Sequence, residues 1–371
     1  MEKTLSICVA VYNIKEKFLR ECIESITADQ SPDIEIILGD DCSENNSGRI
    51  CMEYEKKDSR IKYICPQKNG GVSAMRNLMI QAAQGKWIVF ADGDDAVVAS
   101  YVKTLKEQAS SACDIICFQW QRFSGELPKI SDKDEKLTLI DPDACMGFSK
   151  ACLTGAPPQL EKYGMENSTP SSVCNKAYRR EFLTDSGLYF REGMKKAQDV
   201  EFNTRAFFCC KKLGYIPKIM YLYRTNPDSI CNRYSRDYEK IAEDIMKYDM
   251  ENLETLFGGD EELRKQWGNY KLLHLIIDNF GLNIFHQKNP KPSKQRRRDF
   301  FDFAGREPYK SFFAEFDFYA YRWNERKLIL KLAARKQYGI LNFMYTFPIS
   351  FRIYGGLKNR LKIKARNENA K

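Results

Sequence analysis

Histidine is almost absent from this chain, and several common catalytic motifs are missing. The only two histidines, His274 and His286, lie in a helical segment among apolar neighbours. Nucleophilic sites that pair a serine or cysteine with a histidine are therefore not expected. Neither a Gly-x-x-x-x-Gly-Lys-Ser/Thr phosphate loop nor a Gly-x-Gly-x-x-Gly fingerprint occurs, which leaves both classes of nucleotide-binding loop unsupported.

The sequence contains 13 cysteines but no Cys-x-x-Cys pair, and it also lacks long apolar runs. The cysteines lie within apolar stretches, and the first residues run directly into a strand-like segment without a secretory signal. We therefore expect a reducing, cytoplasmic location, with cysteines acting as small buried hydrophobes. No run of about 18 apolar residues is present, so any membrane contact is expected to be peripheral.

The net charge of +9 is concentrated near the C-terminus. From Lys331 onward there are ten basic residues and one acidic residue. Residues 338–354 are rich in aromatic and aliphatic side chains, and Lys358, Arg360, Lys362, Lys364 and Arg366 follow. Two interpretations stay open here. The segment either contacts the anionic inner face of the cell membrane, or packs on the rest of the protein with its charges in solvent.

The first 120 residues alternate between apolar strand-like runs and segments with helical spacing. Strands are expected at 5–11, 34–38, 61–64, 87–90 and 114–120, and helices at 16–27, 47–57, 73–83 and 101–110. Short connections and this alternation predict an α/β fold with a mostly parallel central sheet flanked by helices. A helix at 198–213, helical spacing over 237–285 and an exposed linker at 288–298 are also expected.

Carboxylates follow the ends of two of these strands, where an α/β sheet forms its ligand crevice. The sharpest cluster is Asp92-Gly93-Asp94-Asp95, whose alternate carboxylates suit a hard divalent cation such as Mg²⁺ or Mn²⁺. Taken alone, the same acidic turn is more often a solvated loop. Asp40-Asp41 ends the second strand. A carboxylate there either accepts a hydrogen bond from a nucleobase N–H or forms an acidic turn or N-cap before the next helix.

Two further segments are candidates for the same crevice. The Gly70-Gly71 turn leads into a helix that carries Arg76 near its start, and its backbone N–H groups and the arginine suit a diphosphate. Asp199 precedes an apolar helical run and suits a general base, although a carboxylate at a helix start is also explained by the helix dipole.

In this order the motifs resemble those of the family 2 glycosyltransferases, over about residues 5–231. The resemblance is carried by Leu5–Asn13, Asp40–Ser43, Gly71–Asn77, Gly85–Asp95, Cys174–Arg180, Gln198-Asp199 and Tyr223-Arg224 with Ser229-Ile230. It implies a GT-A fold: a glycosyltransferase domain over 1–232, with a nucleotide-sugar half at 1–100 and an acceptor half at 101–232. Residues 233–371 would form a mainly helical, basic C-terminal region.

The resemblance also implies roles for individual residues. Asp199 would be the catalytic base, and Asp92 and Asp94 would bind Mn²⁺ or Mg²⁺. The nucleotide-sugar would be bound by Ala10, Tyr12, Asn13, Asp41, Gly71, Arg76, Asp92 and Asp94. The chain departs from the family pattern at Ala10, Cys42, Met75 and Gln198, where Pro, Gly, an earlier Arg and an acidic residue are usual.

The resulting hypothesis is an inverting, metal-dependent transfer of a sugar, most often from a UDP-sugar. The acceptor would be a glycan or lipid-linked glycan in surface polysaccharide biosynthesis, and nucleic acid is not an expected partner. A non-catalytic protein of the same fold that binds nucleotide or glycan is the alternative. A nucleotidyltransferase is a third, but it would normally carry a glycine-rich loop where Tyr12-Asn13-Ile14-Lys15 stands.

Overall fold

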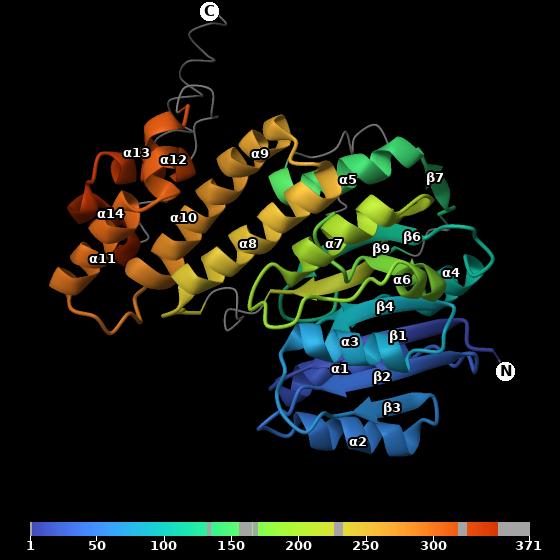
Figure 1. The fold of residues 1–371 in the computed structure, drawn as a ribbon. Helices are drawn as coiled ribbons and strands as arrows, with labels where there is room; N and C mark the ends of the chain where they lie inside the picture. Colours follow the sequence, from blue (N-terminus) through green and yellow to red (C-terminus); the bar gives the residue numbers. More distant parts are fainter. Residues whose placement is uncertain are drawn as a thin grey trace, which may run out of the picture. The chain divides into compact units, whose positions relative to one another are not determined.

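The computed structural model describes residues 2–131, 135–155, 165, 170–225, 233–317 and 325–347. The chain forms two compact units, one of residues 1–227 with 244–260 and one of residues 228–243 with 261–371 (Figure 1). The expected boundary between domains at residue 232 stays a prediction.

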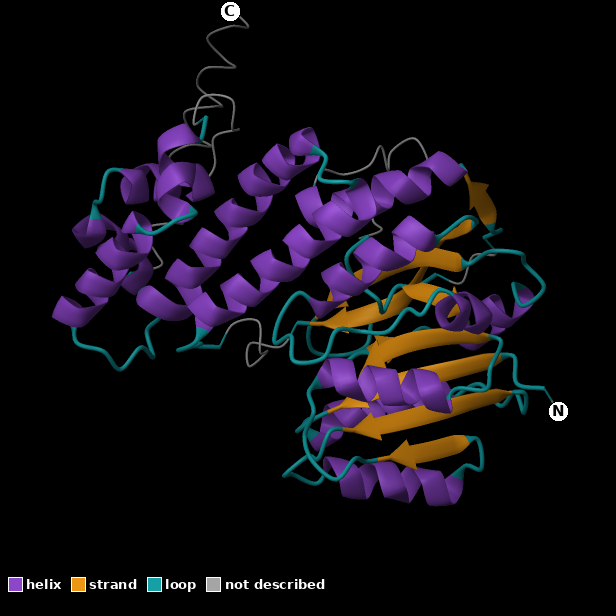
Figure 2. Ribbon diagram, viewed as in Figure 1, coloured by secondary structure: helices purple, strands orange, loops and turns teal. Residues whose placement is uncertain are grey.

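The first unit is built on one mixed sheet of nine strands in the order β3-β2-β1-β4-β8-β6-β9-β5, with β7 paired to β9 (Figure 2). The strands are β1 (Leu5–Val11), β2 (Ile34–Asp40), β3 (Ile61–Ile64), β4 (Trp87–Asp92), β5 (Ala96–Val97), β6 (Ile115–Phe123), β7 (Thr138–Ile140), β8 (Lys176–Arg179) and β9 (Leu213–Arg224).

Helices flank this sheet, as the alternation in the sequence predicts. They are α1 (Glu16–Thr27), α2 (Ser47–Lys57), α3 (Val72–Ala82), α4 (Tyr101–Glu107), α5 (Pro142–Thr154), α6 (Arg180–Asp185) and α7 (Gln198–Cys209). The helix α8 (Tyr238–Phe257) follows, and its residues from 244 onward belong to this unit. The expected helix at 198–213 is shorter than predicted, because residues from Leu213 onward pair with β6.

Strands β1 to β4 are parallel, and their registers align their C-terminal ends. Val11 pairs with Asp40, and Ala10 pairs with Gly39 on one side and Asp92 on the other. The strands β1, β2 and β4 are buried on both faces, which explains why they read as continuous apolar runs without alternation. The acidic residues that follow β2 and β4 consequently lie at one edge of the sheet.

The strand β8 joins the two halves of the sheet by pairing antiparallel with both β4 and β6. The strand β9 then runs parallel to β6 with a register shift near Gln119, and antiparallel to β5. No strand was expected at β8, where the sequence shows only the motif Cys174–Arg180.

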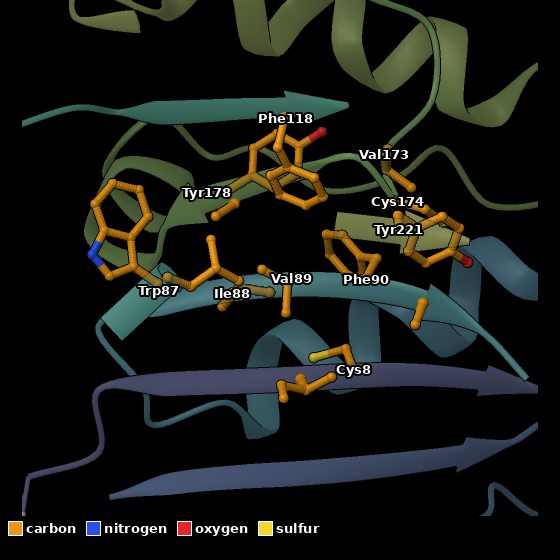
Figure 3. Close-up of a cluster of buried hydrophobic side chains, with 14 of the residues drawn as sticks. Cys8, Trp87, Ile88, Val89, Phe90, Phe118, Val173, Cys174, Tyr178 and Tyr221 are labelled. Atoms are coloured by element: carbon orange, nitrogen blue, oxygen red, sulfur yellow. The ribbon is translucent and has the colours of Figure 1, made fainter. Parts of the chain in front are cut away.

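One part of the core of the first unit surrounds β4 and β8 (Figure 3). Phe90 packs edge-on against Tyr178 and Phe190, with ring centroids 6.0 and 5.4 Å apart. Phe190 in turn stacks on Phe202 of α7 at 4.1 Å. These aromatic contacts fix α7 against the sheet, which matters because Asp199 lies in the first turn of that helix.

The second unit is helical. After the start of α8 it contains α9 (Glu261–Trp267), α10 (Leu273–Asn279), α11 (Ser293–Gly305), α12 (Tyr309–Glu315), α13 (Glu325–Ala334) and α14 (Tyr338–Thr346), with π-helical turns η3 (Gly268–Leu272) and η4 (Phe280–Ile284) flanking α10. Its core is aromatic: the Phe280 ring contacts Phe285, Phe300 and Phe303, and Phe285 also contacts Phe300.

The prediction of a linker over 288–298 was wrong for its second part. Residues from Ser293 onward form α11, which buries Phe300, Phe303 and Ala304. The run of basic residues masked the helical spacing, because it lies in the first two turns and its apolar partners come later. Over the described part of the chain, no helix has the length and apolar composition that a membrane crossing requires.

Candidate active site

The candidate site begins where Asp41 leaves the sheet after β2. Its backbone N–H donates to the Val11 carbonyl at 2.9 Å. Its carboxylate accepts the backbone N–H groups of Gly70 and Gly71, both at 2.8 Å. Asp41 is almost fully buried, so it shapes the turn before α3. Because each carboxylate oxygen has further acceptor capacity, these two bonds are compatible with a nucleobase contact.

The turn after β1 is held by Asn13, which has a left-handed backbone with φ of 52°. Its side-chain Oδ1 accepts the backbone N–H groups of Glu44 and Asn45, at 2.8 and 3.3 Å. The neighbouring Tyr12 is 42% exposed, which is unusual for a large ring beside a buried strand. An exposed ring at this edge is available for stacking on a flat ligand.

The acidic turn after β4 is tightly fixed by its backbone. The N–H of Gly93 donates to the Ala10 carbonyl at 2.9 Å, and a Cβ at this position would lie only 3.1 Å from the same oxygen. Asp95 is buried, accepting the Tyr221 hydroxyl at 2.6 Å and the Arg224 N–H at 2.7 Å. Asp95 therefore has a structural role, while Asp92 and Asp94 are partly exposed.

Arg76 of α3 connects the acidic turn with Asp199. Its Nη2 donates to Asp92 Oδ1 at 3.0 Å, and its Nη1 donates to Asp199 Oδ1 at 2.5 Å. The arginine side chain is only 4% exposed and lies over the Phe190 ring at 5.2 Å. In such a site a two-armed guanidinium holds both carboxylates in a fixed geometry.

Asp199 lies in the first turn of α7, where the helix dipole favours negative charge. Its second oxygen, Oδ2, accepts the backbone N–H of Val173 at 3.3 Å. Ala197, the residue directly before α7, has a left-handed backbone with φ of 62°. A non-glycine residue in this region is strained, which is common at functional sites.

The electrostatics of Asp92 reflect this crowding. Burial raises the pKa of Asp92, and the charges of Asp199 and Asp94 add to the rise while Arg76 opposes it. Several carboxylates at one edge of a sheet repel one another unless cations are present. Arg76 supplies one positive charge, and a divalent cation would lower this repulsion further.

A site for Mg²⁺ or Mn²⁺ needs several oxygen ligands. Among the described residues no group of three His, Cys, Asp or Glu side chains forms a complete metal site. The partly exposed carboxylates of Asp92 and Asp94 nevertheless fit a cation that takes its remaining ligands from substrate phosphates and water. The residues present therefore fit a metal that is shared with a diphosphate.

The contacts that hold the acidic turn were not predicted from the sequence. Tyr221 and Arg224 on β9 hold the acidic turn: the Tyr221 hydroxyl also accepts the Asp92 N–H at 3.1 Å, and Arg224 Nε donates to the Asp94 carbonyl at 2.7 Å. Arg224 lies between the Phe18 and Phe123 rings and pairs with Glu21 at 2.7 Å. The motif Tyr223-Arg224 is visible in the sequence, but the sequence does not show that Arg224 contacts the acidic turn.

Comparison with known proteins identifies the family. The model of glycosyl transferase family 2 matches residues 6–185. Two Bacillus subtilis proteins with glycosyltransferase names are similar: EpsJ is 35% identical over 61% of this chain and 62% of its own length, and EpsH is 30% identical over 74% and 75%.

A solved structure shares the fold. Staphylococcus aureus TarS 1–349, crystallised with UDP-GlcNAc, superimposes with a TM-score of 0.58 over 92% of this chain and 91% of that one, at 19% identity. The mixed sheet, the flanking helices and the helical region that follows are thus those of a GT-A protein. The sequence matches, together with this fold, show that the chain belongs to the family 2 glycosyltransferases.

Proposed function

We propose that this protein is an inverting glycosyltransferase that moves a sugar from a nucleotide-sugar, in the first instance a UDP-sugar, to a glycan or lipid-linked glycan. The observation that carries the proposal is the Arg76 bridge, which places Asp92 and Asp199 on one guanidinium although they are far apart in the sequence. One carboxylate belongs to the expected donor side and the other to the expected acceptor side.

Asp199 is the proposed general base. It accepts the proton of an acceptor hydroxyl while that oxygen attacks the anomeric carbon, and the bond from this carbon to the diphosphate oxygen breaks. Attack from the side opposite the leaving group inverts the configuration. Arg76 and the Val173 N–H support this role because they hold the carboxylate in one orientation.

The nucleotide would lie along the ends of β1 and β2. Tyr12 offers an exposed ring, Asp41 an acceptor for a base N–H, and Ala10, Asn13 and Gly71 the backbone surface of the pocket. Asp92 and Asp94 would hold Mn²⁺ or Mg²⁺. Such a cation, when bound, supplies electrostatic stabilisation of the charge on the departing nucleoside diphosphate.

The similar proteins support the choice of donor and pathway. TarS has been crystallised with UDP-GlcNAc and with UDP, and it is named a poly(ribitol-phosphate) β-N-acetylglucosaminyltransferase. A donor with a uridine diphosphate and an acceptor that is a surface polymer are therefore the first to test. We also propose that the protein works in the cytoplasm, at or near the inner face of the cell membrane.

The experiment is a thermal-shift screen of nucleotide-sugars with and without Mn²⁺, followed by assays of variants. We expect Asp199→Asn to lower transfer by at least about 100-fold while donor binding is kept, because a general base contributes about 10²–10⁴-fold. Asp94→Ala should lose both transfer and the Mn²⁺-dependent part of donor binding.

A matched control is Asp143→Asn, since Asp143 lies in the first turn of α5 as Asp199 does in α7. An Asp199→Asn enzyme with an unchanged rate would refute the assignment of the base. Donor binding without turnover, over a broad panel of acceptors, would instead support the non-catalytic alternative that the departure at Gln198 raises.

A further inference from the structure

The helix α14 presents an apolar stripe to solvent. Tyr338, Leu341 and Met344 point into the second unit and are buried. On another side of the helix, Ile340, Phe343 and Phe347 are 49%, 56% and 54% exposed. Their spacing of three and four residues places them on one face. The helix and the residue after it are thus apolar on a buried side and on an exposed side.

Single exposed apolar residues are normal, but this grouping is not. The described residues contain nine large exposed hydrophobic side chains, and three of them lie within these eight positions. The Phe343 and Phe347 rings are 5.0 Å apart, so they form a continuous surface. An isolated exposed residue such as Leu139 needs no special explanation, but this stripe does.

The packing on the buried side holds this stripe outward. The Tyr338 ring contacts Phe285 and Phe300 at 5.5 and 5.8 Å, and its hydroxyl donates to the Ser293 carbonyl at 3.3 Å. Tyr345 stacks on Phe285 at 5.1 Å. Because these rings anchor one side of α14 to the aromatic core, the helix cannot turn its exposed side inward without losing them.

The charge of the chain is concentrated around the same segment. Residues 326–371 contain 12 of the 59 basic residues and one of the 50 acidic residues. The rest of the chain, with 47 basic and 49 acidic residues, is close to neutral. In the described part, Arg335 and Lys336 are exposed directly before α14. The remaining basic residues of the expected tail, from residue 348 onward, lie outside the described residues.

We infer that α14 and the exposed Arg335 and Lys336 directly before it form a docking surface for an anionic lipid leaflet. Aromatic and aliphatic side chains enter the boundary between headgroups and acyl chains, while lysine and arginine pair with anionic headgroups. A lipid surface matches both the apolar stripe and the charge. This inference deepens the proposed location at the inner face of the membrane, and it is independent of the proposed reaction because binding to lipid requires no transfer of sugar.

The test uses the full chain and measures flotation with vesicles of phosphatidylcholine, with or without phosphatidylglycerol. We expect binding only when phosphatidylglycerol is present, weakened by added salt. The variant Phe343→Ser with Phe347→Ser should lower partitioning at least about ten-fold, because two aromatic rings no longer enter the lipid. Replacing the exposed Arg335 and Lys336 by Gln should lower it as well.

Matched controls separate the stripe from general effects. Leu139→Ser removes an apolar residue that is 71% exposed on β7, and it should leave binding unchanged. Replacing the exposed Lys56 and Lys62 by Gln removes the same number of charges elsewhere on the protein. Donor hydrolysis by each variant should stay at the wild-type rate, which separates this inference from the proposed function.

Three results would overturn the inference. The first is no binding to anionic vesicles. The second is equal binding by the Phe343→Ser/Phe347→Ser variant, which would mean that charge alone attracts the protein. The third is a wild-type protein that is dimeric in solution and does not bind vesicles, while the Phe343→Ser/Phe347→Ser variant is monomeric. The stripe would then be an interface between copies of the chain.

Discussion

At the scale of single residues, the catalytic proposal depends on Arg76. The sequence placed this arginine near the donor because it follows a glycine turn at a helix start. The structure shows a buried guanidinium with both arms on carboxylates. Its position was predictable from the motif, but its partners were not, because Asp199 lies 123 positions away in the sequence.

A substitution of Arg76 tests whether it positions the base. We expect Arg76→Gln to lower kcat about 100-fold with little change in the KM for the donor, because Asp199 loses the contact that orients it. Arg76→Lys keeps the charge but cannot reach both carboxylates with a planar fork, so its rate should be intermediate.

The readout that separates positioning from simple instability is chemical rescue. Guanidinium added to Arg76→Ala should restore part of the rate at a concentration that leaves the wild type unchanged. An increase in donor KM as large as the loss in kcat would argue for direct donor binding instead.

At the scale of elements, local pattern predicted the first half of the sheet well and the second half poorly. β1, β2 and β4 were visible as apolar runs because each is buried on both faces. β8 has four residues, and its place between β4 and β6 results from pairing with strands that are distant in sequence. Nothing in the local spacing of residues 176–179 encodes that pairing.

The helix α7 is held by a buried acid, which gives a stability prediction. Glu201 is 1% exposed, and its carboxylate accepts bonds of 2.7 Å from Arg191 and Arg205. Arg191 also pairs with Glu251 of α8 at 2.7 Å. We expect Glu201→Ala to lower the free energy of unfolding by about 3–5 kcal/mol, since two arginines lose a buried partner.

Urea denaturation measures this change. Glu181→Ala serves as the control, because Glu181 is an exposed acid in the first turn of α6 and should matter by less than about 0.5 kcal/mol. If Glu201→Ala lowered the free energy of unfolding as little as this control, the ion pairs of Glu201 with Arg191 and Arg205 would not be what holds α7.

A second element-scale prediction concerns α10, where burial lowers the pKa of His274 and the nearby Arg326 charge lowers it further. The ring Nδ1–H donates to the Tyr270 carbonyl at 2.8 Å, and Nε2 accepts from Arg326 at 2.7 Å. A folded pKa below the unfolded value means that the unfolded chain binds the proton more readily. The stability of the second unit should therefore fall as pH drops below about 6.5.

The measurement is the free energy of unfolding from neutral pH down to about pH 5. His274→Gln should flatten the dependence in this range relative to the wild type, and His286→Gln serves as the control. A variant that keeps the full dependence would assign it to the carboxylates instead.

At the scale of the whole molecule, the chain consists of two units with different chemistry. The first is an α/β unit that contains the whole candidate site, and the second is helical with an aromatic core. Composition indicated this division, since family motifs end near residue 231 and helical spacing follows. The apolar stripe on α14 could not be predicted, because the pattern alone does not show which aromatic residues are buried.

Two units predict two unfolding transitions in calorimetry. A nucleotide-sugar with Mn²⁺ should raise the midpoint of only one of them, since a ligand stabilises the unit that binds it. That transition should also be the one that Glu201→Ala lowers, while mild acid should lower the other. One cooperative transition that responds to all three changes would contradict this description.

The position of β8 has a consequence for how the chain is made. Until residues 176–179 emerge from the ribosome, β4 has a partner on one side only and its open edge is available to other chains. The sheet that contains the acidic turn is thus completed late in synthesis, and β9 comes later still. Fragments that stop before β8 should aggregate rather than bind nucleotide, so the nucleotide-sugar half cannot be produced alone by truncation.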